Sequence, residues 1–283
     1  MAKQLFYFKR EEAMRNIKLI ISDIDGTILD KNHQIDSYLP ELMPILKQKE
    51  IPFVLASARS PLGIAPISRK LGISDFPIAC YNGALISMGD EVLSQHSIDK
   101  KELAFLHDFL KREFPTVSIN VYSGQDWFVN TLDKWVQIEA NITGESPKVT
   151  SITDFIREEH TLVHKLLLID KADTIQKLQN ILSIMDFPQT DFYLSKDNYL
   201  EVTHNQVSKK QALLELANYY QIPLKEIMTL GDNYNDIPMI ETAGLGIAMG
   251  NAPTDVKDCA NAVTYSNEQN GVSQAIKLHV LAK

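Results

Sequence analysis

The chain has 283 residues, of which 45% are hydrophobic and 23% are charged, and its formal net charge is −8. This length can bury one large core or two smaller ones, so we expect one or two folded domains. The negative balance argues against a nucleic-acid-binding protein, because phosphate backbones are held mainly by excess lysine and arginine. No apolar run approaches the roughly 20 residues of a membrane span, so we expect no membrane partner either.

The first 16 residues precede the first predicted strand. Their short apolar run, residues 5–8, is followed at once by the charged run 9–12. This is unlike the long apolar region and small-residue cleavage site of a secretory signal, so we expect a cytoplasmic protein with an N-terminal extension at 1–16. Cys80 and Cys259 lie far apart without CxxC spacing, which favours neither a disulfide framework nor a zinc site.

Short and nearly continuous apolar runs predict strands that are buried on both faces, as in a parallel sheet. These runs occupy residues 17–21, 52–56, 78–81, 227–230 and 245–249. Helical spacing of leucines follows the first run and precedes the fourth. The alternation of strand and helix predicts an α/β fold with a doubly wound, Rossmann-like parallel-sheet core.

The middle of the chain predicts a different architecture. Helical patterns there alternate with strand-like runs, and two pairs of these runs, 117–122 with 127–130 and 192–195 with 199–203, are joined by short turns. Because hairpins belong to antiparallel sheets, we expect an inserted α+β cap domain at residues 87–204. The core domain would then comprise residues 17–86 and 205–283.

Two carboxylates, Asp23 and Asp25, come directly after the first predicted strand and precede Gly26. Open α/β sheets place their ligands at the carboxyl ends of parallel strands. Like charges at this spacing repel, and a bound cation is the usual remedy. The alternative is a plain turn, since Asp-Gly is a common turn dipeptide.

A second acidic cluster follows the predicted strand 227–230 and contains Asp232, Asn235 and Asp236. Both clusters should lie at the same edge of one sheet. Carboxylate and amide oxygens gathered there suit Mg²⁺, whereas the spacing lacks the twelve-residue loop of a calcium site. Alone, this cluster could equally be a solvated acidic turn before a helix.

Two further positions are candidates for binding an anion. Ser57 and Ala58 end the second predicted strand, where a hydroxyl and a backbone N–H can donate, although a helix N-cap is the simpler interpretation. Lys209 begins a predicted helix whose Ser208 and Gln211 match an S-x-x-Q capping box. A cation at a helix N-terminus opposes the macrodipole, which indicates a role other than helix stability. Lys210 is the competing lysine.

In chain order, the Asp-x-Asp-Gly-Thr run, Ser57, Lys209 and the Gly-Asp-x-x-Asn-Asp run resemble the four motifs of the haloacid dehalogenase superfamily. The chain is similar to the Cof-type branch, whose large cap lies between the second and third motifs. Further agreement comes from the runs at 81–84, 199–202 and 248–252, and the resemblance covers residues 17–280. The chain departs from the family where Ala58 and Lys210 replace the usual glycines.

The resemblance implies a phosphatase in which Asp23 attacks phosphorus and becomes an aspartyl phosphate, while Asp25 acts as acid and base. It implies that Mg²⁺ is held by the Asp23 side chain, the Asp25 backbone carbonyl and the Asp232 side chain. Asp236 would lie close to the metal or steady Lys209. The phosphoryl oxygens would be bound by Ser57, the Ile24 and Ala58 N–H groups, Lys209 and Asn235.

The resemblance also implies a small phosphorylated metabolite as substrate, chosen by the cap. Sugar phosphates, pyridoxal phosphate, flavin-pathway phosphates and nucleotides all remain open, as does a monomer or a small homo-oligomer. Cap residues that could read the leaving group, or simply form the core, are Tyr122, Trp127, Trp135, His164 and Lys165. The alternatives to a phosphatase are a phosphomannomutase-like phosphotransferase and a non-catalytic sensor of phosphate ligands.

Overall fold

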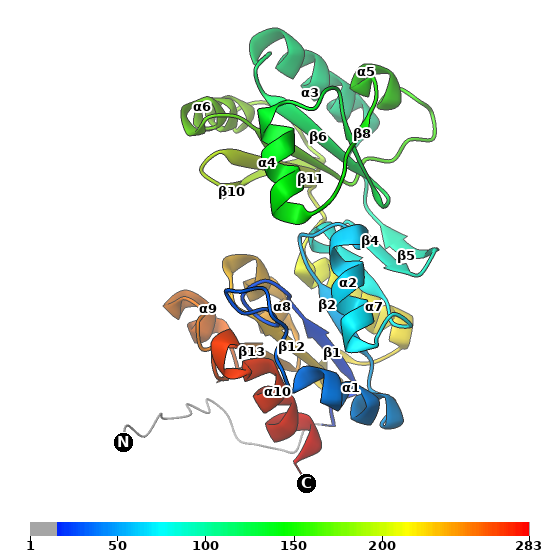
Figure 1. Ribbon diagram of the computed structural model, residues 1–283, viewed down its shortest axis with the longest axis vertical. Helices are drawn as coiled ribbons and strands as arrows, with labels where there is room; N and C mark the ends of the chain where they lie inside the picture. The colour runs from blue at the N-terminus through cyan, green and yellow to red at the C-terminus, as the bar shows by residue number, and fades with distance from the viewer. Residues whose placement is uncertain (1–15, 283) are drawn as a thin grey trace. The chain divides into compact units, whose positions relative to one another are not determined.

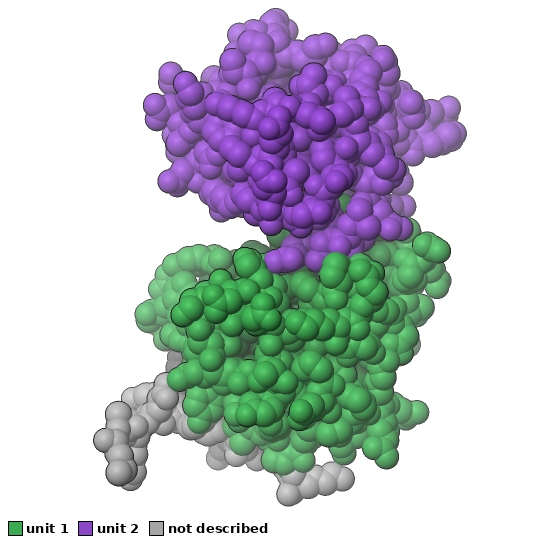
Figure 2. Space-filling view, in the orientation of Figure 1, with its two compact units in different colours: residues 1–58, 64–94, 208–283 green, residues 59–63, 95–207 purple. Residues whose placement is uncertain are grey.

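The computed structural model describes residues 16–282 (Figure 1). It divides into two compact units, which Figure 2 shows in different colours. Of the described residues, the core unit comprises 16–58, 64–94 and 208–282, and the cap unit comprises Arg59–Gly63 and Gln95–Val207. The extension expected at 1–16 lies outside the described residues except for its last member. Within 16–282, no helix combines the length and the apolarity that crossing a membrane requires.

The core unit is built on one eight-stranded sheet of order β14-β13-β12-β1-β2-β3-β4-β5. The six strands from β14 to β3 run parallel, and β4 turns back antiparallel to β3. The strands are β1 (Leu19–Ser22), β2 (Phe53–Ala56), β3 (Ile78–Cys80), β4 (Leu85–Met88), β5 (Glu91–Gln95), β12 (Ile227–Gly231), β13 (Leu245–Ala248) and β14 (Ala262–Val263). The doubly wound parallel core predicted from the apolar runs is therefore confirmed.

Helices cover both faces of this sheet. They are α1 (Leu39–Gln48), α2 (Pro61–Leu71), α7 (Lys209–Tyr220), α8 (Ile237–Thr242), α9 (Thr254–Cys259) and α10 (Gly271–Ile276). Alternate residues of the central strands, such as Leu19 and Ile21, pack against Leu213 and Leu216 of α7 and against Met239 of α8. Figure 1 shows α1 and α10 on the opposite side. Burial on both faces explains why the central strands read as continuous apolar runs.

The order of the strands reverses beside β1. From β1 the chain proceeds to β2 and β3 on one side, whereas β12, β13 and β14 lie on the other. Ser22 at the end of β1 is paired with Leu230 of β12 and with Leu55 of β2. The residues that follow these three strands therefore leave the sheet at one edge, which is the topological switch point where open α/β sheets bind ligands.

The cap unit has a six-stranded sheet of order β10-β11-β9-β6-β7-β8, antiparallel except for the last pair. The strands are β6 (Ser118–Ser123), β7 (Asp126–Val129), β8 (Lys148–Val149), β9 (Lys165–Ile169), β10 (Thr190–Lys196) and β11 (Tyr199–His204). The helices are α3 (Lys100–Glu113), α4 (Lys134–Thr143), α5 (Ile152–Phe155) and α6 (Ala172–Leu182). Leucines of α3 and α6 pack on one face of the sheet and form a core that belongs to this unit alone.

Local chemistry sets the ends of the cap helices. The carboxylate of Asp99 accepts hydrogen bonds from the N–H groups of Lys101 and Glu102, so α3 begins there. Asp133 caps α4 in the same way, and Gly144 ends α4 in the left-handed conformation. The two units divide at Ser94 and Ser208 because β4 and β5 extend the core sheet. The cap border expected at residue 87 therefore falls inside that sheet.

We expect residues 95–207 to fold when they are expressed alone, because their core and sheet are complete within the segment. The ends of the segment also meet, since the rings of His96 and His204 lie 6.0 Å apart. The measurement is near-ultraviolet circular dichroism together with urea unfolding. A cooperative transition is expected, and a fragment that lacks one would contradict independent folding.

Candidate active site

Asp23 leaves the sheet directly after β1 and is 6% exposed. Its backbone N–H continues the ladder by donating to the Leu230 carbonyl at 3.0 Å. The next turn is closed by the Ile24 carbonyl, which accepts from the N–H groups of Ile28 and Leu29 at 2.9 and 3.0 Å. Ile24 is fully buried, whereas Asp25 is exposed on the same loop. The two acids of the motif therefore occupy very different surroundings.

Lys209 is the first residue of α7, and its side chain is only 1% exposed. Its ammonium donates to Asp23 Oδ1 and to Asp236 Oδ1, each at 2.5 Å. Lys210 points to solvent, so Lys209 is the lysine that enters the site. This arrangement explains a cation at a helix N-terminus: two carboxylates outweigh the unfavourable helix dipole.

The capping box predicted at the start of α7 forms only in part. Ser208 Oγ accepts from the Gln211 N–H at 3.1 Å, as expected of an N-cap. The Gln211 side chain instead donates to Glu215 at 2.9 Å, one helical turn further along. The i,i+4 partner therefore replaces the reciprocal bond to the N-cap.

Asp236 is fully buried and joins the loop after β12 to Lys209. While its Oδ1 accepts from Lys209, its Oδ2 accepts from the N–H groups of Asp232 and Asn233 at 2.9 and 3.0 Å. A hydrogen bond to a charged acceptor is stronger than a neutral one, so this carboxylate holds the whole turn. Both of its oxygens are engaged by the protein.

Asp232 lies against the loop that follows β1. Thr27 Oγ1 donates to its Oδ1 at 3.0 Å, and Asn251 Nδ2 donates to its Oδ2 at 3.3 Å. Asn251 also donates to the Gly26 carbonyl at 2.8 Å. At Gly26, with φ of +80°, a Cβ would lie 2.3 Å from Asp232 Oδ2. Only glycine permits both this backbone and this close approach of the carboxylate.

The residues present fit a divalent cation. Carboxylate oxygens of Asp23, Asp232 and Asp236 lie within 4.8 Å of one another. Hard oxygen donors of this kind are the ligands that Mg²⁺ prefers. Three carboxylates against one ammonium also leave two negative charges in excess when all are ionised. The cluster could therefore hold a divalent metal, whose charge would balance that excess.

Burial shifts the ionisation of the site. It raises the pKa of Asp23 to about 8; Asp236 and Asp232 act in the same direction, and Lys209 opposes them. Burial, followed by Asp236, also raises the pKa of Asp232 to about 6. Burial lowers the pKa of Lys209, but the two carboxylates outweigh this effect and raise the pKa above its ordinary value. Lys209 therefore stays charged while Asp23 and Asp232 can take up protons.

The predicted anion-binding residues Ser57, Ala58 and Asn235 follow β2 and β12, the strands on either side of β1. Ser57 is buried after β2, where its N–H donates to the Ala79 carbonyl at 2.9 Å, and Ala58 beside it is half-buried. Asn235 is exposed on the loop after β12 and donates to Asn82 Oδ1 at 3.2 Å. The direct contacts join Asp23, Asp232, Asp236 and Lys209, whereas Ser57 and Asn235 are linked to each other through Asn82.

Sequence reasoning assigned no role to three residues that contact the predicted ones, namely Thr27, Asn82 and Asn251. Thr27 lies inside the first acidic motif. Asn82 and Asn251 lie in runs noted only as agreement with a family. The available signal was an asparagine next to a glycine just past a predicted strand, at the edge where the site forms.

Comparison with known proteins identifies relatives of this chain. The sequence model of one protein family, the haloacid dehalogenase-like hydrolases, matches residues 20–276 of this chain. The chain belongs to that family. One similar protein, from Haemophilus influenzae, is 32% identical and the match covers 90% of this chain and 95% of its own length. Another, phosphatase YwpJ of Bacillus subtilis, is 29% identical, and the match covers 94% of this chain and 100% of YwpJ. Both carry the name phosphatase, and the chain is an enzyme of this hydrolase class.

Solved structures in the family share the fold. A haloacid dehalogenase-like hydrolase from Bacteroides thetaiotaomicron superimposes with a TM-score of 0.84 at 29% identity, covering 93% of this chain and 99% of its own. TM0651 from Thermotoga maritima superimposes with a TM-score of 0.85 at 26% identity, and the match covers 93% of this chain and 97% of TM0651. Because coverage is nearly complete in both directions, the core and the insert are both shared. The resemblance to the family is confirmed.

Four of the five cap residues considered for substrate reading are buried. Trp127 donates from its indole to Asn120 at 3.1 Å and stacks on Tyr122 with ring centroids 5.9 Å apart. Lys165 pairs with Glu201 at 3.6 Å, and His164 Nδ1 accepts from the Gly124 N–H at 3.0 Å. Trp135, the fifth, is half-buried on α4. These contacts support the second interpretation given above, in which the residues stabilise the cap unit rather than read the leaving group.

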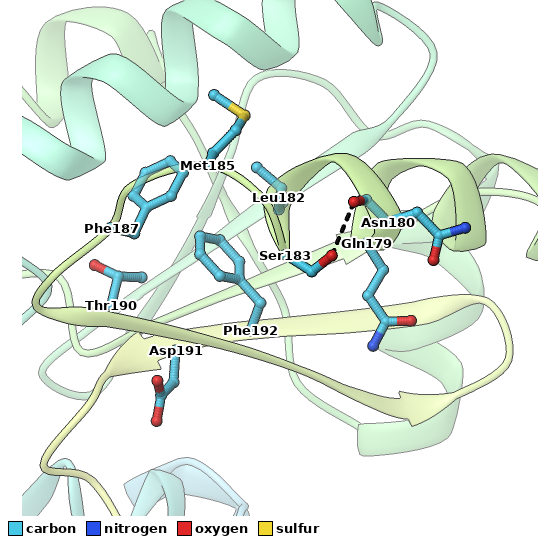
Figure 3. A pocket seen from close by; sticks show the side chains of 9 residues that line it. All are labelled: Gln179, Asn180, Leu182, Ser183, Met185, Phe187, Thr190, Asp191 and Phe192. Carbon is cyan, nitrogen blue, oxygen red and sulfur yellow. Dashed lines mark hydrogen bonds between the residues drawn. The ribbon is translucent and has the colours of Figure 1, made fainter.

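The cap unit also contains a hollow of about 480 Å³ beside α6 and β10 (Figure 3). Leu182, Phe187 and Phe192 contribute apolar surface, and Ser183 donates to the Asn180 carbonyl at 2.8 Å. Among the described residues that line it, Asp191 alone carries a charge. A hollow without a positive group offers little to a phosphate, so the acidic cluster and Lys209 remain the candidate site of this hydrolase.

Replacing Asp236 should destabilise the protein strongly. Asp236→Ala is expected to lower the free energy of unfolding by about 3–5 kcal/mol, because it leaves Lys209 buried with one carboxylate fewer. Urea unfolding followed by circular dichroism measures this change. The control is Asp25→Asn on the exposed side of the site, for which we expect a change within about 0.5 kcal/mol. Equal effects of the two substitutions would contradict the anchoring role of Asp236.

Proposed function

We propose that this enzyme hydrolyses phosphate monoesters of small metabolites in a Mg²⁺-dependent reaction through an aspartyl phosphate on Asp23. The observation that carries the proposal is the buried Asp23 carboxylate at a strand end, 2.5 Å from the Lys209 ammonium and clustered with Asp232. A carboxylate serves as a nucleophile when it is oriented and when nearby cations reduce its repulsion of the anionic substrate.

In the first half-reaction, one Asp23 oxygen attacks phosphorus while the bond from phosphorus to the leaving oxygen breaks. Lys209 donates to Asp23 Oδ1, which orients the carboxylate, and we propose that the second oxygen, Oδ2, is the attacking atom. An ammonium has three N–H groups, of which Asp23 and Asp236 take two. We propose that the third donates to a phosphoryl oxygen as charge accumulates there.

Asp25 is proposed as the general acid and base. It lies two residues from Asp23 but is exposed, so its carboxyl can exchange protons with the leaving group and with water. It would protonate the departing alkoxide and then take a proton from the water that attacks the aspartyl phosphate. That second attack releases inorganic phosphate and restores Asp23.

The Asp23 and Asp232 side chains and the Asp25 backbone carbonyl are proposed to hold Mg²⁺. Asp236 is proposed to hold Lys209, because it is fully buried and accepts from the Lys209 ammonium and from two backbone N–H groups. When bound, the ion would supply positive charge that offsets the repulsion between carboxylate and phosphate. The remaining phosphoryl contacts are proposed to come from Ser57, the Ile24 and Ala58 N–H groups and Asn235. We place the reaction in the cytoplasm, with a phosphorylated metabolite as substrate.

The test compares two variants with the parent enzyme. Asp23→Asn should reduce Mg²⁺-dependent hydrolysis of p-nitrophenyl phosphate at least about 1,000-fold, because the nucleophile is lost. Asp25→Asn should also be slow. It should nevertheless accumulate acid-stable label from a ³²P-phosphorylated substrate, because Asp23 can still attack phosphorus while hydrolysis of the aspartyl phosphate is slowed. Quench-flow kinetics and gel autoradiography measure both effects.

The matched control for these carboxylate-to-amide changes is Asp75→Asn, at an exposed ion pair with Lys47. It should retain the parent rate. Full activity in Asp23→Asn would end the nucleophile assignment. Transfer of phosphate to a second sugar position faster than its release as inorganic phosphate would point to a phosphotransferase instead.

Binding of Mg²⁺ should depend on pH. The raised pKa of Asp23, about 8, means that the metal-free site holds a proton below that pH, and the cation must displace it. Apparent affinity should therefore rise from pH 6 to about pH 8 and then level off. Isothermal titration calorimetry with MgCl₂, in buffers of different ionisation enthalpy, measures both the affinity and the released proton. Equal affinities at pH 6.5 and 8.5 would contradict this expectation.

A further inference from the structure

The turn Tyr81–Gly83 directly follows β3 and has an unusual backbone. Its three residues all have positive φ, with 52° at Tyr81, 57° at Asn82 and 102° at Gly83. Tyr81 is fully buried and Asn82 is 8% exposed. Left-handed backbone is unfavourable for residues with a Cβ, and it persists only where the surroundings enforce it. Such strain often accompanies a functional site.

Asn82 joins two of the loops that the proposed function assigns to the phosphoryl group. Its backbone N–H donates to the Ser57 carbonyl at 2.8 Å. Its side-chain Oδ1 accepts from Asn235 Nδ2 at 3.2 Å. Ser57 follows β2 and Asn235 follows β12, so one residue spans from one side of β1 to the other.

Gly83 brings the same turn against the helix that carries Lys209. A Cβ at Gly83 would lie 2.9 Å from the Ser208 carbonyl oxygen and 3.0 Å from the Ala212 Cβ. The first turn of α7 therefore packs directly on the backbone of this turn. The turn thus contacts the three elements that present Ser57, Lys209 and Asn235.

We infer that Asn82 is a positioning residue for the phosphatase reaction, which orients the Asn235 amide and the Ser57 loop toward one phosphoryl group. The inference rests on the proposed function. Asn235 Nδ2 carries two hydrogens, and the bond to Asn82 uses one of them and sets the plane of the amide. The second hydrogen then has a defined direction, which is what a preorganised anion site requires.

The residue type at position 82 meets two demands at once. Asparagine tolerates the left-handed region better than most residues with a Cβ, and it supplies an acceptor oxygen for Asn235. Aspartate would meet both demands but would place a negative charge beside the proposed phosphate site. Glycine would keep the backbone conformation and the N–H but lose the acceptor.

These differences define the experiment. Asn82→Gly should lower kcat/KM for p-nitrophenyl phosphate about 10- to 100-fold and weaken inhibition by orthovanadate, a phosphate mimic, while Tm changes little. Asn82→Ala should show the same kinetic loss with a lower Tm, because alanine cannot relax into positive φ as easily. Asn82→Asp should keep the Tm and show the largest rise in KM, since the added charge repels the substrate.

The decisive readout is a double-mutant cycle with Asn235→Ala. If Asn82 acts through Asn235, then adding Asn82→Gly to Asn235→Ala should cause little further loss of kcat/KM or of vanadate binding. Independent, additive losses would overturn the inference, as would parent-level kinetics in Asn82→Gly. A parent enzyme that neither hydrolyses the ester nor binds vanadate would instead overturn the proposed function itself.

Discussion

The site depends on one buried charge arrangement, in which the Lys209 ammonium lies between the carboxylates of Asp23 and Asp236. Removing these groups from water costs several kcal/mol for each ion, so none of them can be buried without its partners. The three residues come from the start of α7, the end of β1 and the turn after β12. Their mutual requirement therefore ties three elements that lie far apart in sequence at the edge of the sheet.

The excess of negative charge around Lys209 determines much of the surrounding chemistry. Asp232 accepts hydrogen bonds from two neutral donors, Thr27 and Asn251, and lies against the backbone at Gly26, where a side chain would collide with it. Burial raises the pKa values of Asp23 and Asp232, and the neighbouring carboxylates add to this effect. A site with this electrostatic character could hold protons or a divalent cation, and the proposed phosphoryl transfer requires the cation.

The insert is stabilised separately from this chemistry. Its leucine core, its capped helices and the buried contacts of Trp127 and Lys165 are all internal to it. Within a family that shares one fold, function depends on the site rather than on the fold, so a separately stabilised insert can vary without disturbing the carboxylate cluster. The substrate is accordingly the least constrained part of the proposed function.

The sequence by itself determined the parallel core, the inserted α+β segment and the carboxylates at strand ends, because apolar runs and short motifs are properties of neighbouring residues. Only the tertiary structure decided that Lys209 rather than Lys210 enters the site, that Gln211 turns to Glu215, and that β4 and β5 belong to the core sheet. The contacts that Asn82 and Asn251 make are of the same kind. Each depends on the direction of a side chain or on a partner distant in sequence, and no local pattern encodes either.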